Sequence, residues 1–313
     1  MSRQYLTPVH VSGLLRRSCK YVFGDLPTIR VEREARPAPL VSVIIATYNW
    51  SNVLRFAIQS VLWQTEQNFE LLVIGDACTD DTESMVRGFN DGRIRWKNLA
   101  TNSGSQCAPN NAGLAMARGK YIAYLGHDDI WHPQHLGRMI ASLESRNADV
   151  ASALVEMIGP KGTNFRVVTG IYPAEGFNAN DCLPPSGLLH RADVAARAGA
   201  WPDYRTVHRN PDMEFVYRAW AAGCRFVSTR ELTVYKFNSA LRKNSYIEKP
   251  CHEQTAYSGR LLRTRWFQLL EALQIARVHV FRLPMIEPGF TPPPDASTTG
   301  WYVTQYRKYR GLE

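Results

Sequence analysis

The chain has 313 residues and a formal net charge of +9, and 45% of its residues are hydrophobic and 21% charged. This composition is that of a soluble globular protein with room for one α/β domain with additions or for two small domains. The 18 prolines and 21 glycines are spread along the chain, which excludes low-complexity and collagen-like classes. The basic residues are dispersed and form no RNA-binding or helix-turn-helix pattern, so we expect no nucleic-acid partner.

The cysteines and the N-terminal segment favour a reducing compartment. None of the six cysteines belongs to a CxxC pair or a zinc-type ligand set, so we expect buried free thiols. Arg16, Arg17 and Lys20 interrupt the early segment, which lacks the apolar run of a signal peptide. No stretch approaches the ~20 apolar residues of a spanning helix. We expect a cytoplasmic protein, with attachment at a membrane surface as the alternative.

Regular structure is predicted to begin after a linker. Residues 1–39 end in the proline-containing stretch 34–39, which is typical of a linker. Val41–Ala46 is a β-branched apolar run, the pattern of a strand buried on both faces of a parallel sheet. Apolar residues then recur at helical spacing as far as Leu62, which predicts a helix after the capping candidates Ser51 and Asn52.

Strands and helices continue to alternate along the next part of the chain. Further strands are predicted at Phe69–Ile74, Ile94–Leu99, Tyr121–Leu125 and Val150–Ile158, and further helices after the capping pair Asp80 and Glu83, at Asn110–Arg118, at Pro133–Arg146 and at Asn210–Ala222. This alternation with short connections predicts an α/β fold with a mostly parallel sheet flanked by helices. Ligands of such sheets lie beyond the carboxyl ends of the strands, which directs attention to the loops after Ala46, Ile74, Leu99 and Leu125.

Two adjacent carboxylates, Asp128 and Asp129, follow the strand that ends at Leu125. They repel each other unless a cation or a hydrogen-bond donor lies beside them. Mg²⁺ and Mn²⁺ are commonly held by one or two carboxylates together with diphosphate oxygens, so this pair predicts a metal site. Other polar loop residues have ordinary alternatives: Asp80 suits a helix cap, and Asp76 suits a turn as well as a binding site.

Three motifs resemble one known family. The runs VSVIIATYN, LLVIGDACTDDT and NSGSQCAPNNAGLAMARGKYIAYLGHDDIWHP are similar in order and spacing to the nucleotide-binding half of the family 2 glycosyltransferases. The resemblance covers roughly residues 40–235. It implies the GT-A fold, with a Rossmann-like sheet, and transfer of a sugar from a nucleotide-sugar donor with inversion of the anomeric centre.

The resemblance also implies roles for individual residues. It implies that the nucleoside is bound by Thr47, Tyr48, Asn49 and Asp76, and that the diphosphate and ribose are lined by the segment Asn102–Arg118, including Asn102, Gly104, Asn111 and Arg118. Asp128 matches the metal-binding acid of the family's DxD motif, which implies a Mn²⁺ or Mg²⁺ cofactor, with Asp129 as its companion.

The sequence departs from the family pattern at two acidic positions. The first aspartate of the common VDDGS motif is Gly75 here, and the first acid of the DxD motif is Gly126. These departures put ribose contacts and metal affinity in question. His127 could fill the second gap by binding ribose, or it could be an ordinary loop side chain.

The acceptor half is expected to supply a catalytic base. Asp212 matches the catalytic aspartate of the family's Glu-Asp motif, although Pro211 stands where the glutamate is usual. Without the resemblance, Asp212 is an acid favoured by the dipole at a helix start. Glu214 is a candidate for binding acceptor hydroxyls, and Lys236 and Arg242 are candidates for a lid over the diphosphate or for a solvated basic loop.

The C-terminal part is predicted to be one helix and an irregular tail. A helix over Gly259–Leu283 carries leucines interspersed with arginines. It suits packing on the catalytic domain, or alternatively contact with an anionic bilayer. We divide the chain into an extension (1–39), a donor-binding half (40–158), an acceptor-binding half (159–248) and a C-terminal part (249–313).

The sequence therefore predicts a metal-dependent glycosyltransferase that uses a nucleotide sugar, with UDP favoured as the nucleotide. The expected acceptor is a hydroxyl of a polysaccharide or of a lipid-linked saccharide. A non-catalytic relative that binds nucleotide sugars is the main alternative, because two family acids are absent. A nucleotidyltransferase is less favoured, because Thr47-Tyr48-Asn49-Trp50 replaces the expected glycine-rich basic loop. No residue pattern indicates the donor sugar or the oligomeric state.

Overall fold

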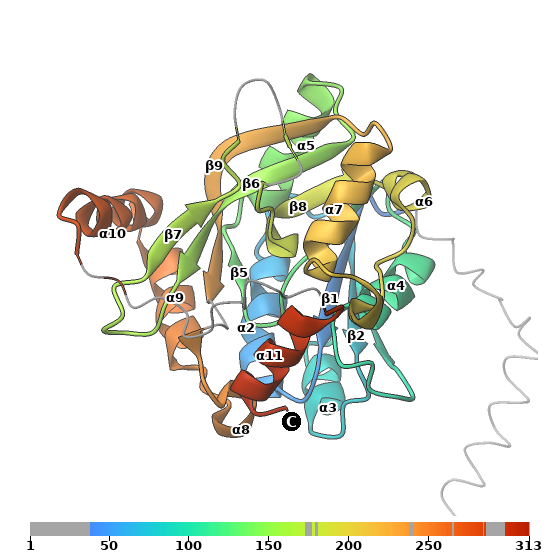
Figure 1. The fold of residues 1–313 in the computed structure, drawn as a ribbon, viewed down its shortest axis with the longest axis horizontal. Coiled ribbons are helices and arrows are strands. Elements are labelled where there is room, and N and C mark those ends of the chain that lie inside the picture. Colours follow the sequence, from blue (N-terminus) through green and yellow to red (C-terminus); the bar gives the residue numbers. More distant parts are fainter. Residues whose placement is uncertain are drawn as a thin grey trace, which may run out of the picture. The chain divides into compact units, whose positions relative to one another are not determined.

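A computed structural model describes residues 38–172, 177–178, 181–237, 241–264, 266–283, 285 and 298–312. Nearly all of the predicted linker at 1–39 and part of the predicted tail lie outside the described residues. The tail was wrongly predicted to be irregular, because residues 301–310 form a helix. The described chain forms a central mixed sheet with helices packed along it (Figure 1).

The elements follow the predicted order in the first half of the chain. The strands are β1 (Val41–Thr47), β2 (Phe69–Gly75), β3 (Ile94–Asn98), β4 (Tyr121–Tyr124), β5 (Ile130–Trp131), β6 (Val150–Ile158), β7 (Arg166–Thr169), β8 (Leu188–Arg191) and β9 (Phe226–Phe237). The α-helices are α2 (Ser51–Leu62), α3 (Thr82–Arg87), α4 (Cys107–Met116), α5 (His135–Ser145), α6 (Val194–Ala198), α7 (Pro211–Ala221), α8 (Ser245–Glu248), α9 (His252–Arg263), α10 (Phe267–Val280) and α11 (Trp301–Arg310), with short 3₁₀ turns at Pro185–Gly187 and Tyr204–Thr206.

The strands β3, β2, β1 and β4 pair in parallel in that order. Every residue of β2 is buried, as are nearly all residues of β1, which confirms the prediction from their continuous apolar runs. The helical spacing in α2 is confirmed too, because Val53, Leu54, Ala57, Ile58 and Val61 are the buried side chains of one face. These elements place the loops after β1, β2 and β4 at one edge of the sheet.

The second half of the sheet is mixed rather than parallel. β8 pairs antiparallel with both β4 and β6. β7 also pairs antiparallel with β6, and β5 pairs antiparallel with β9. Only the pairing of β6 with β9 is parallel there, with irregular register near Leu154. The prediction of a mostly parallel sheet thus describes only the group of strands β1 to β4. β8 and β9 were not predicted, because a four-residue strand and a polar, interrupted strand carry little periodicity.

The predicted helix over Gly259–Leu283 is two helices, α9 and α10. The chain is extended at Thr264 between them. The break lets Phe267 turn inward, where its ring lies 5.1 Å from Tyr235 of β9 and 6.0 Å from Tyr257 of α9. In a continuous helix, Tyr257 and Phe267 would lie about 15 Å apart along the axis, so their rings could not meet. In the described part of the chain, no helix has the length and hydropathy needed to cross a bilayer.

The described cysteines are Cys78, Cys107, Cys182, Cys224 and Cys251, and all five are free thiols, as predicted. Only Cys107 and Cys224 are buried, whereas Cys182 is exposed.

Candidate active site

A pocket of about 380 Å³ opens where β1, β2 and β4 end. Its wall combines residues from the loops after these strands with residues from α4, α7, β9 and α11, including Thr47, Tyr48, Asp76, Asn102, Gly104, Asn110, His127, Asp128, Asp212, Lys236, Tyr246, Tyr306, Arg307 and Arg310. The structure therefore brings together the predicted nucleoside loop, the Asp128 motif and the predicted base, Asp212.

Asp76 shapes the side of the pocket formed by the loop before α4. Its two carboxylate oxygens accept hydrogen bonds from the backbone N–H groups of Ser103 and Gly104, at 2.9–3.1 Å. The Asn102 side chain donates to the Asp76 carbonyl at 2.9 Å. A carboxylate offers about four acceptor positions, so Asp76 retains capacity for a ligand donor.

His127 is buried and takes part in two hydrogen bonds within the protein. Its Nδ1 lies 2.9 Å from Thr47 Oγ1, and its Nε2 lies 3.2 Å from the Tyr246 hydroxyl. Burial lowers the pKa of His127 to about 4, so the imidazole is neutral at neutral pH. Because both ring nitrogens have protein partners, His127 joins β1 to the segment around Tyr246.

Asp128 faces the pocket and contacts a cation from the far end of the chain. Its Oδ2 lies 3.3 Å from Nη2 of Arg310 in α11, and its backbone carbonyl accepts a hydrogen bond from Gln254. Burial alone raises the pKa of the Asp128 carboxyl, but nearby positive charges, including Arg310 and Lys236, bring it below its ordinary value. Asp128 is therefore an anion.

Asp129 points the other way, into the protein. Its Oδ2 accepts from Ser186 Oγ at 2.5 Å and from Lys236 Nζ at 3.1 Å, and its Oδ1 accepts from the Phe237 N–H at 3.2 Å. The side chain is inaccessible to solvent. With both oxygens engaged and facing away from the pocket, Asp129 holds β9 against the β4 loop and is poorly placed as the metal ligand predicted from sequence.

The geometry explains why the two family acids are glycines here. A Cβ at Gly75 would lie 2.5 Å from Asn98 Oδ1 and 2.6 Å from the Trp96 ring. A Cβ at Gly126 would lie 2.6 Å from the Asp129 carboxylate. Side chains of this protein therefore already fill the space that an acidic side chain would enter at either position.

We expect Gly75→Ala to destabilise the protein by about 1–3 kcal/mol, because its Cβ would overlap Asn98 and Trp96. Gly259→Ala is the matched control: its Cβ, in α9, meets open space, so it should leave stability unchanged or raise it by about 0.5–1 kcal/mol. Urea unfolding of the two variants measures the difference. Equal urea midpoints for the two variants would show that Asn98 and Trp96 move away from the added Cβ with little loss of free energy of unfolding.

Asp212 lies in the first turn of α7, directly after Pro211. The Met213 N–H donates to its Oδ1 at 2.9 Å. Burial raises the pKa of the Asp212 carboxyl above its ordinary value, against the opposing effects of the Met213 N–H and Lys236. A half-buried carboxylate with a raised pKa in a pocket has the properties of a general base.

Lys236 of β9, one of the two lid candidates named from the sequence, lines the pocket. Burial disfavours its charge, but Asp129 and Asp128 raise its pKa above the ordinary value, so it stays protonated. The other predicted lid residue, Arg242, lies outside the pocket wall. It binds Glu253 through Nε and Nη2 and the Ile158 carbonyl through Nη1, which anchors it in the protein.

Four further predicted site residues also lie outside the pocket wall. Asn49 joins the loop after β1 to the loop after β2 by accepting from the Thr79 N–H. Asn111 clamps the backbone of Trp201 with both ends of its amide. Arg118 pairs with Glu70 beyond the opposite end of α4, and Glu214 lies 3.8 Å from Arg218 on its own helix. Their observed contacts are with the protein, and the structure does not gather them at this pocket.

Sequence reasoning missed several wall residues. Asn110 is buried in the wall, and its Nδ2 has no hydrogen-bond partner in the described part of the chain. Asn110 could have been named from the sequence, because it adjoins the predicted residue Asn111. The orientation of the helix about its axis decides which of two neighbouring side chains faces a ligand. The α11 residues Tyr306, Arg307 and Arg310 carried no signal, because nothing local indicates where such a helix packs.

Few of the described pocket side chains could act as ligands of a divalent cation. Among the described residues, no three His, Cys, Asp or Glu side chains cluster as metal ligands. Asp128 is the one predicted metal ligand with a carboxylate oxygen on the pocket side. One carboxylate is sufficient for Mg²⁺ or Mn²⁺ when substrate phosphates and water complete the shell. The residues fit a metal that arrives with a diphosphate, and they do not form a preformed metal cage.

Curated relatives match parts of this chain. It is 33% identical over 129 residues to the succinoglycan biosynthesis protein ExoO of Rhizobium meliloti, covering 41% of this chain and 37% of ExoO. It is 37% identical over 121 residues to the Escherichia coli protein WfgD, named UDP-Glc:alpha-D-GlcNAc-diphosphoundecaprenol beta-1,3-glucosyltransferase, covering 38% of this chain and 47% of WfgD. The chain thus spans less than half of either relative.

Solved structures share the fold. The chain superposes on Staphylococcus aureus TarS 1–349 in complex with UDP-GlcNAc with a TM-score of 0.55 at 20% identity, covering 76% of this chain and 70% of that one. It superposes on the mannosyltransferase PcManGT of Pyrobaculum calidifontis, in complex with GDP-Man and Mn²⁺, with a TM-score of 0.51 at 16% identity, covering 88% and 83%.

The family model described as Glycosyl transferase family 2 matches residues 42–195, a span that contains Asp76, Asp128 and Asp129. The structural neighbours confirm the predicted α/β fold of GT-A type. The chain therefore contains a glycosyl transferase family 2 region at residues 42–195.

Proposed function

We propose that this chain is an inverting glycosyltransferase that moves a sugar from a UDP-sugar to an acceptor hydroxyl. The observation that carries the proposal is that Asp128 and Asp212, from distant parts of the sequence, line one pocket. A protein that only binds nucleotide sugars has no use for a carboxylate with a raised pKa beside the donor site. The UDP complex of TarS and the UDP-Glc in the name of WfgD support UDP as the nucleotide.

The nucleoside is proposed to lie against Thr47, Tyr48 and Asp76, where Asp76 accepts a hydrogen bond from the base. Asn102, Gly104 and the buried amide of Asn110 then face the ribose and diphosphate. Residues 40–158 supply most of this donor half and residues 159–248 supply Asp212 and Lys236. α11, from residues 249–313, completes the wall of the donor site.

The reaction is proposed as a single in-line displacement. Asp212 takes the proton of the attacking hydroxyl on the face of the sugar opposite the diphosphate, which inverts the anomeric centre. The diphosphate gains negative charge as the glycosidic bond breaks, and Lys236 lies in the wall of the same pocket. A Mn²⁺ or Mg²⁺ ion held by Asp128 and the diphosphate would supply additional Lewis-acid stabilisation.

The acceptor is proposed to be a saccharide, free or lipid-linked. WfgD is named for an acceptor on diphosphoundecaprenol and ExoO for succinoglycan biosynthesis. The matched segments cover 37% of ExoO and 47% of WfgD, so the acceptor class is a proposal for this chain.

The proposal is tested by incubating the protein with UDP-Glc, UDP-Gal, UDP-GlcNAc and GDP-Man and with saccharide acceptors, with and without Mn²⁺. We expect release of UDP from one donor, and NMR of the product should give the opposite anomeric configuration to the donor. Pyrophosphate production from a sugar phosphate and UTP would instead indicate a nucleotidyltransferase. Donor binding without turnover in the presence of any acceptor would support a non-catalytic protein.

Asp128→Ala is expected to remove the Mn²⁺-dependent part of UDP binding, because Asp128 is the pocket-facing carboxylate. Calorimetric titration with UDP, GDP and dTDP, each with Mn²⁺ or EDTA, measures this part directly. Asp193→Asn, at an exposed site beside α6, is the control and should bind as the wild type does. Mn²⁺-dependent binding that persists in Asp128→Ala would place the metal elsewhere.

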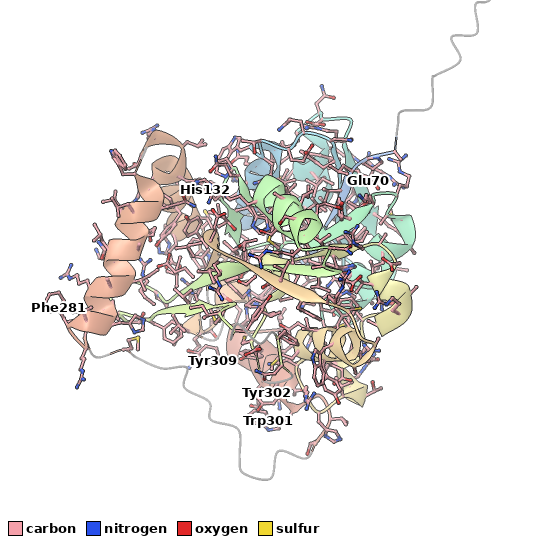
Figure 2. The ribbon with its side chains drawn as sticks, turned by 90° about the horizontal axis from the view of Figure 1, so that it is seen from above. Glu70, His132, Phe281, Trp301, Tyr302 and Tyr309 are labelled. Atoms are coloured by element: carbon pink, nitrogen blue, oxygen red, sulfur yellow. The ribbon has the colours of Figure 1, made fainter. Side chains whose placement is uncertain are left out.

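We also propose that α10 rests on an anionic membrane surface. Figure 2 shows Phe281 at the outer end of α10, away from the sheet. Phe267, Glu271 and Val278 form the inner face of the helix, and an opposite stripe of exposed apolar side chains consists of Trp266, Leu269, Leu270, Leu273, Val280 and Phe281. Leu273 and Phe281 are 56% and 71% exposed.

The charges around this stripe favour lipid over another protein surface. The one acidic side chain of α10, Glu271, is buried and bonded to Arg166, Tyr257 and Arg260. Arg263, Arg277 and Arg282 are exposed beside the stripe, so the outward charge is positive. An apolar stripe with basic residues is typical of helices that lie in the headgroup region of anionic bilayers.

The double variant Leu269→Glu/Leu273→Glu should lose binding to phosphatidylglycerol-containing vesicles in a flotation assay, while the wild type binds. Ile171→Glu, which changes a 66% exposed side chain elsewhere, is the control and should still bind. Wild-type protein that stays with the soluble fraction, and sediments as a dimer disrupted by the double variant, would assign the stripe to a second copy instead.

A further inference from the structure

The pocket contains three cations, and two of them come from one terminal helix. α11 contributes Tyr306, Arg307 and Arg310 to the wall, and Lys236 of β9 is the third cation. The helix is tied in place at both ends: the Gly300 N–H donates to the Val207 carbonyl, and the Asn244 N–H donates to the Tyr309 carbonyl. Figure 1 shows α11 beside α8 and in front of β1, and Figure 2 labels Trp301, Tyr302 and Tyr309 along it.

Arg310 is held in a fixed orientation. Its guanidinium carbon lies 4.5 Å from the centre of the Tyr246 ring and 5.7 Å from that of Trp50, and its Nε donates to Ser245 Oγ at 3.1 Å. Its Nη2 reaches the Asp128 carboxylate at 3.3 Å. A guanidinium carries five N–H donors, so Arg310 retains donors beyond these two contacts.

Arg307 lies one helical turn before Arg310 and faces the opposite wall. Its Nη1 donates to the Gly104 carbonyl at 2.9 Å, in the loop whose N–H groups bind Asp76. A Cβ at position 104 would lie 2.9 Å from that nitrogen, so the glycine leaves room for the Arg307 guanidinium. The two arginines therefore reach the space between the nucleoside loop at Asp76 and the proposed reaction centre at Asp212.

We propose that Arg307 and Arg310 bind the diphosphate of the donor, and that Arg310 competes with a divalent cation for the Asp128 carboxylate. This inference rests on the proposed function. Guanidinium groups bind phosphate oxygens in bidentate pairs and carry a permanent charge. Arg310 already neutralises Asp128, and Gly126 leaves the motif without its first acid. The donor site is thus able to bind a diphosphate before any metal is present.

The test is calorimetric titration of the full-length protein with UDP and with uridine in EDTA. Arg307→Ala and Arg310→Ala should each weaken UDP binding about 10- to 100-fold, which is the range for a lost hydrogen bond to a charged group. Uridine binding should be unchanged, because the base and ribose contacts remain. Lys308→Ala is the matched control: it removes the same charge from an exposed position of α11 outside the pocket wall.

Competition between Arg310 and a divalent cation for Asp128 predicts a second effect. Loss of Arg310 should strengthen metal binding, although it weakens UDP binding. Without nucleotide, Arg310→Ala should bind Mn²⁺ more tightly than the wild type, whereas Arg307→Ala and Lys308→Ala should not. Titration of Mn²⁺ followed by electron paramagnetic resonance of the free ion measures this. Arg310→Lys, which keeps the charge without the planar donor group, should restore part of the UDP affinity in EDTA.

The results separate this inference from the proposed function. Normal UDP binding in EDTA by both alanine variants would overturn the role of α11 even if the wild type transfers sugar. Equal losses for UDP and uridine would also overturn it, because they would indicate a general collapse of the pocket. If the wild-type protein neither binds UDP nor releases it from UDP-sugars, the proposed function itself fails.

Discussion

Asp212→Asn is expected to lower kcat for sugar transfer by about 10²–10⁴, the range for loss of a positioned general base. The KM for the donor should change little, because the asparagine keeps the size of the side chain and the Met213 N–H still has an oxygen to bond. Initial rates of UDP release with saturating acceptor measure the effect. Glu214→Gln, two residues along the same helix, is the control, since Glu214 lies beside Arg218 outside the pocket wall.

The pH profile of kcat offers an independent check on Asp212. Burial raises the Asp212 pKa above 3.8, and the carboxylate is the active form, so the rate should fall as pH drops through this raised value. The residual activity of Asp212→Asn should lack that acidic limb. A variant that retains both the rate and the limb would exclude Asp212 as the base.

The second large effect is a loss of stability in mild acid. His135 and His190 are buried, and burial lowers the pKa of His135 to about 3 and that of His190 to about 4. Unfolded imidazoles take up protons near pH 6.5, so the unfolded chain binds more protons than the folded chain below this pH. The stabilisation is complete above about pH 6.5 and is lost as the pH falls toward the folded values.

The size of this loss follows from the pKa differences. One pKa unit corresponds to about 1.36 kcal/mol, so at pH 5 each histidine should remove about 2 kcal/mol of unfolding free energy. Urea unfolding at pH 7 and pH 5 measures the change. His190→Gln should reduce the difference between the two pH values, whereas His252→Gln, at an exposed position, should leave it as in the wild type. An unchanged difference in His190→Gln would show that its imidazole is not the source.

The donor half was predictable because its signals are local. Val41–Thr47 and Phe69–Gly75 are apolar throughout, which suits only strands buried on both faces. Parallel strands carry their carboxyl ends to one edge, so Asp76 and Asp128 were expected together there. The role of Asp212 needed more than its neighbours, because an acid in the first turn of a helix is common on dipole grounds alone.

Side-chain direction within a motif was less predictable. Asp128 faces the pocket and Asp129 faces β9, although the two are adjacent carboxylates after the same strand. Asn110 faces the pocket, whereas Asn111 clamps Trp201. In each pair the choice depends on which neighbour offers a partner, Lys236 and Ser186 in one case and the Trp201 backbone in the other, and those partners lie far away in sequence.

The amino-acid sequence by itself predicted the α/β class and the resemblance to the family, since both depend on periodicity or motif spacing within short stretches, and it named Asp128 and Asp212 as candidates. The tertiary structure alone decided the mixed half of the sheet, the inward role of Asp129 and the arrival of Arg307 and Arg310 in the pocket. These features depend on contacts between segments up to 203 residues apart, as between Gly104 and Arg307. The free energy of such contacts comes from burial and pairing, which no local pattern encodes.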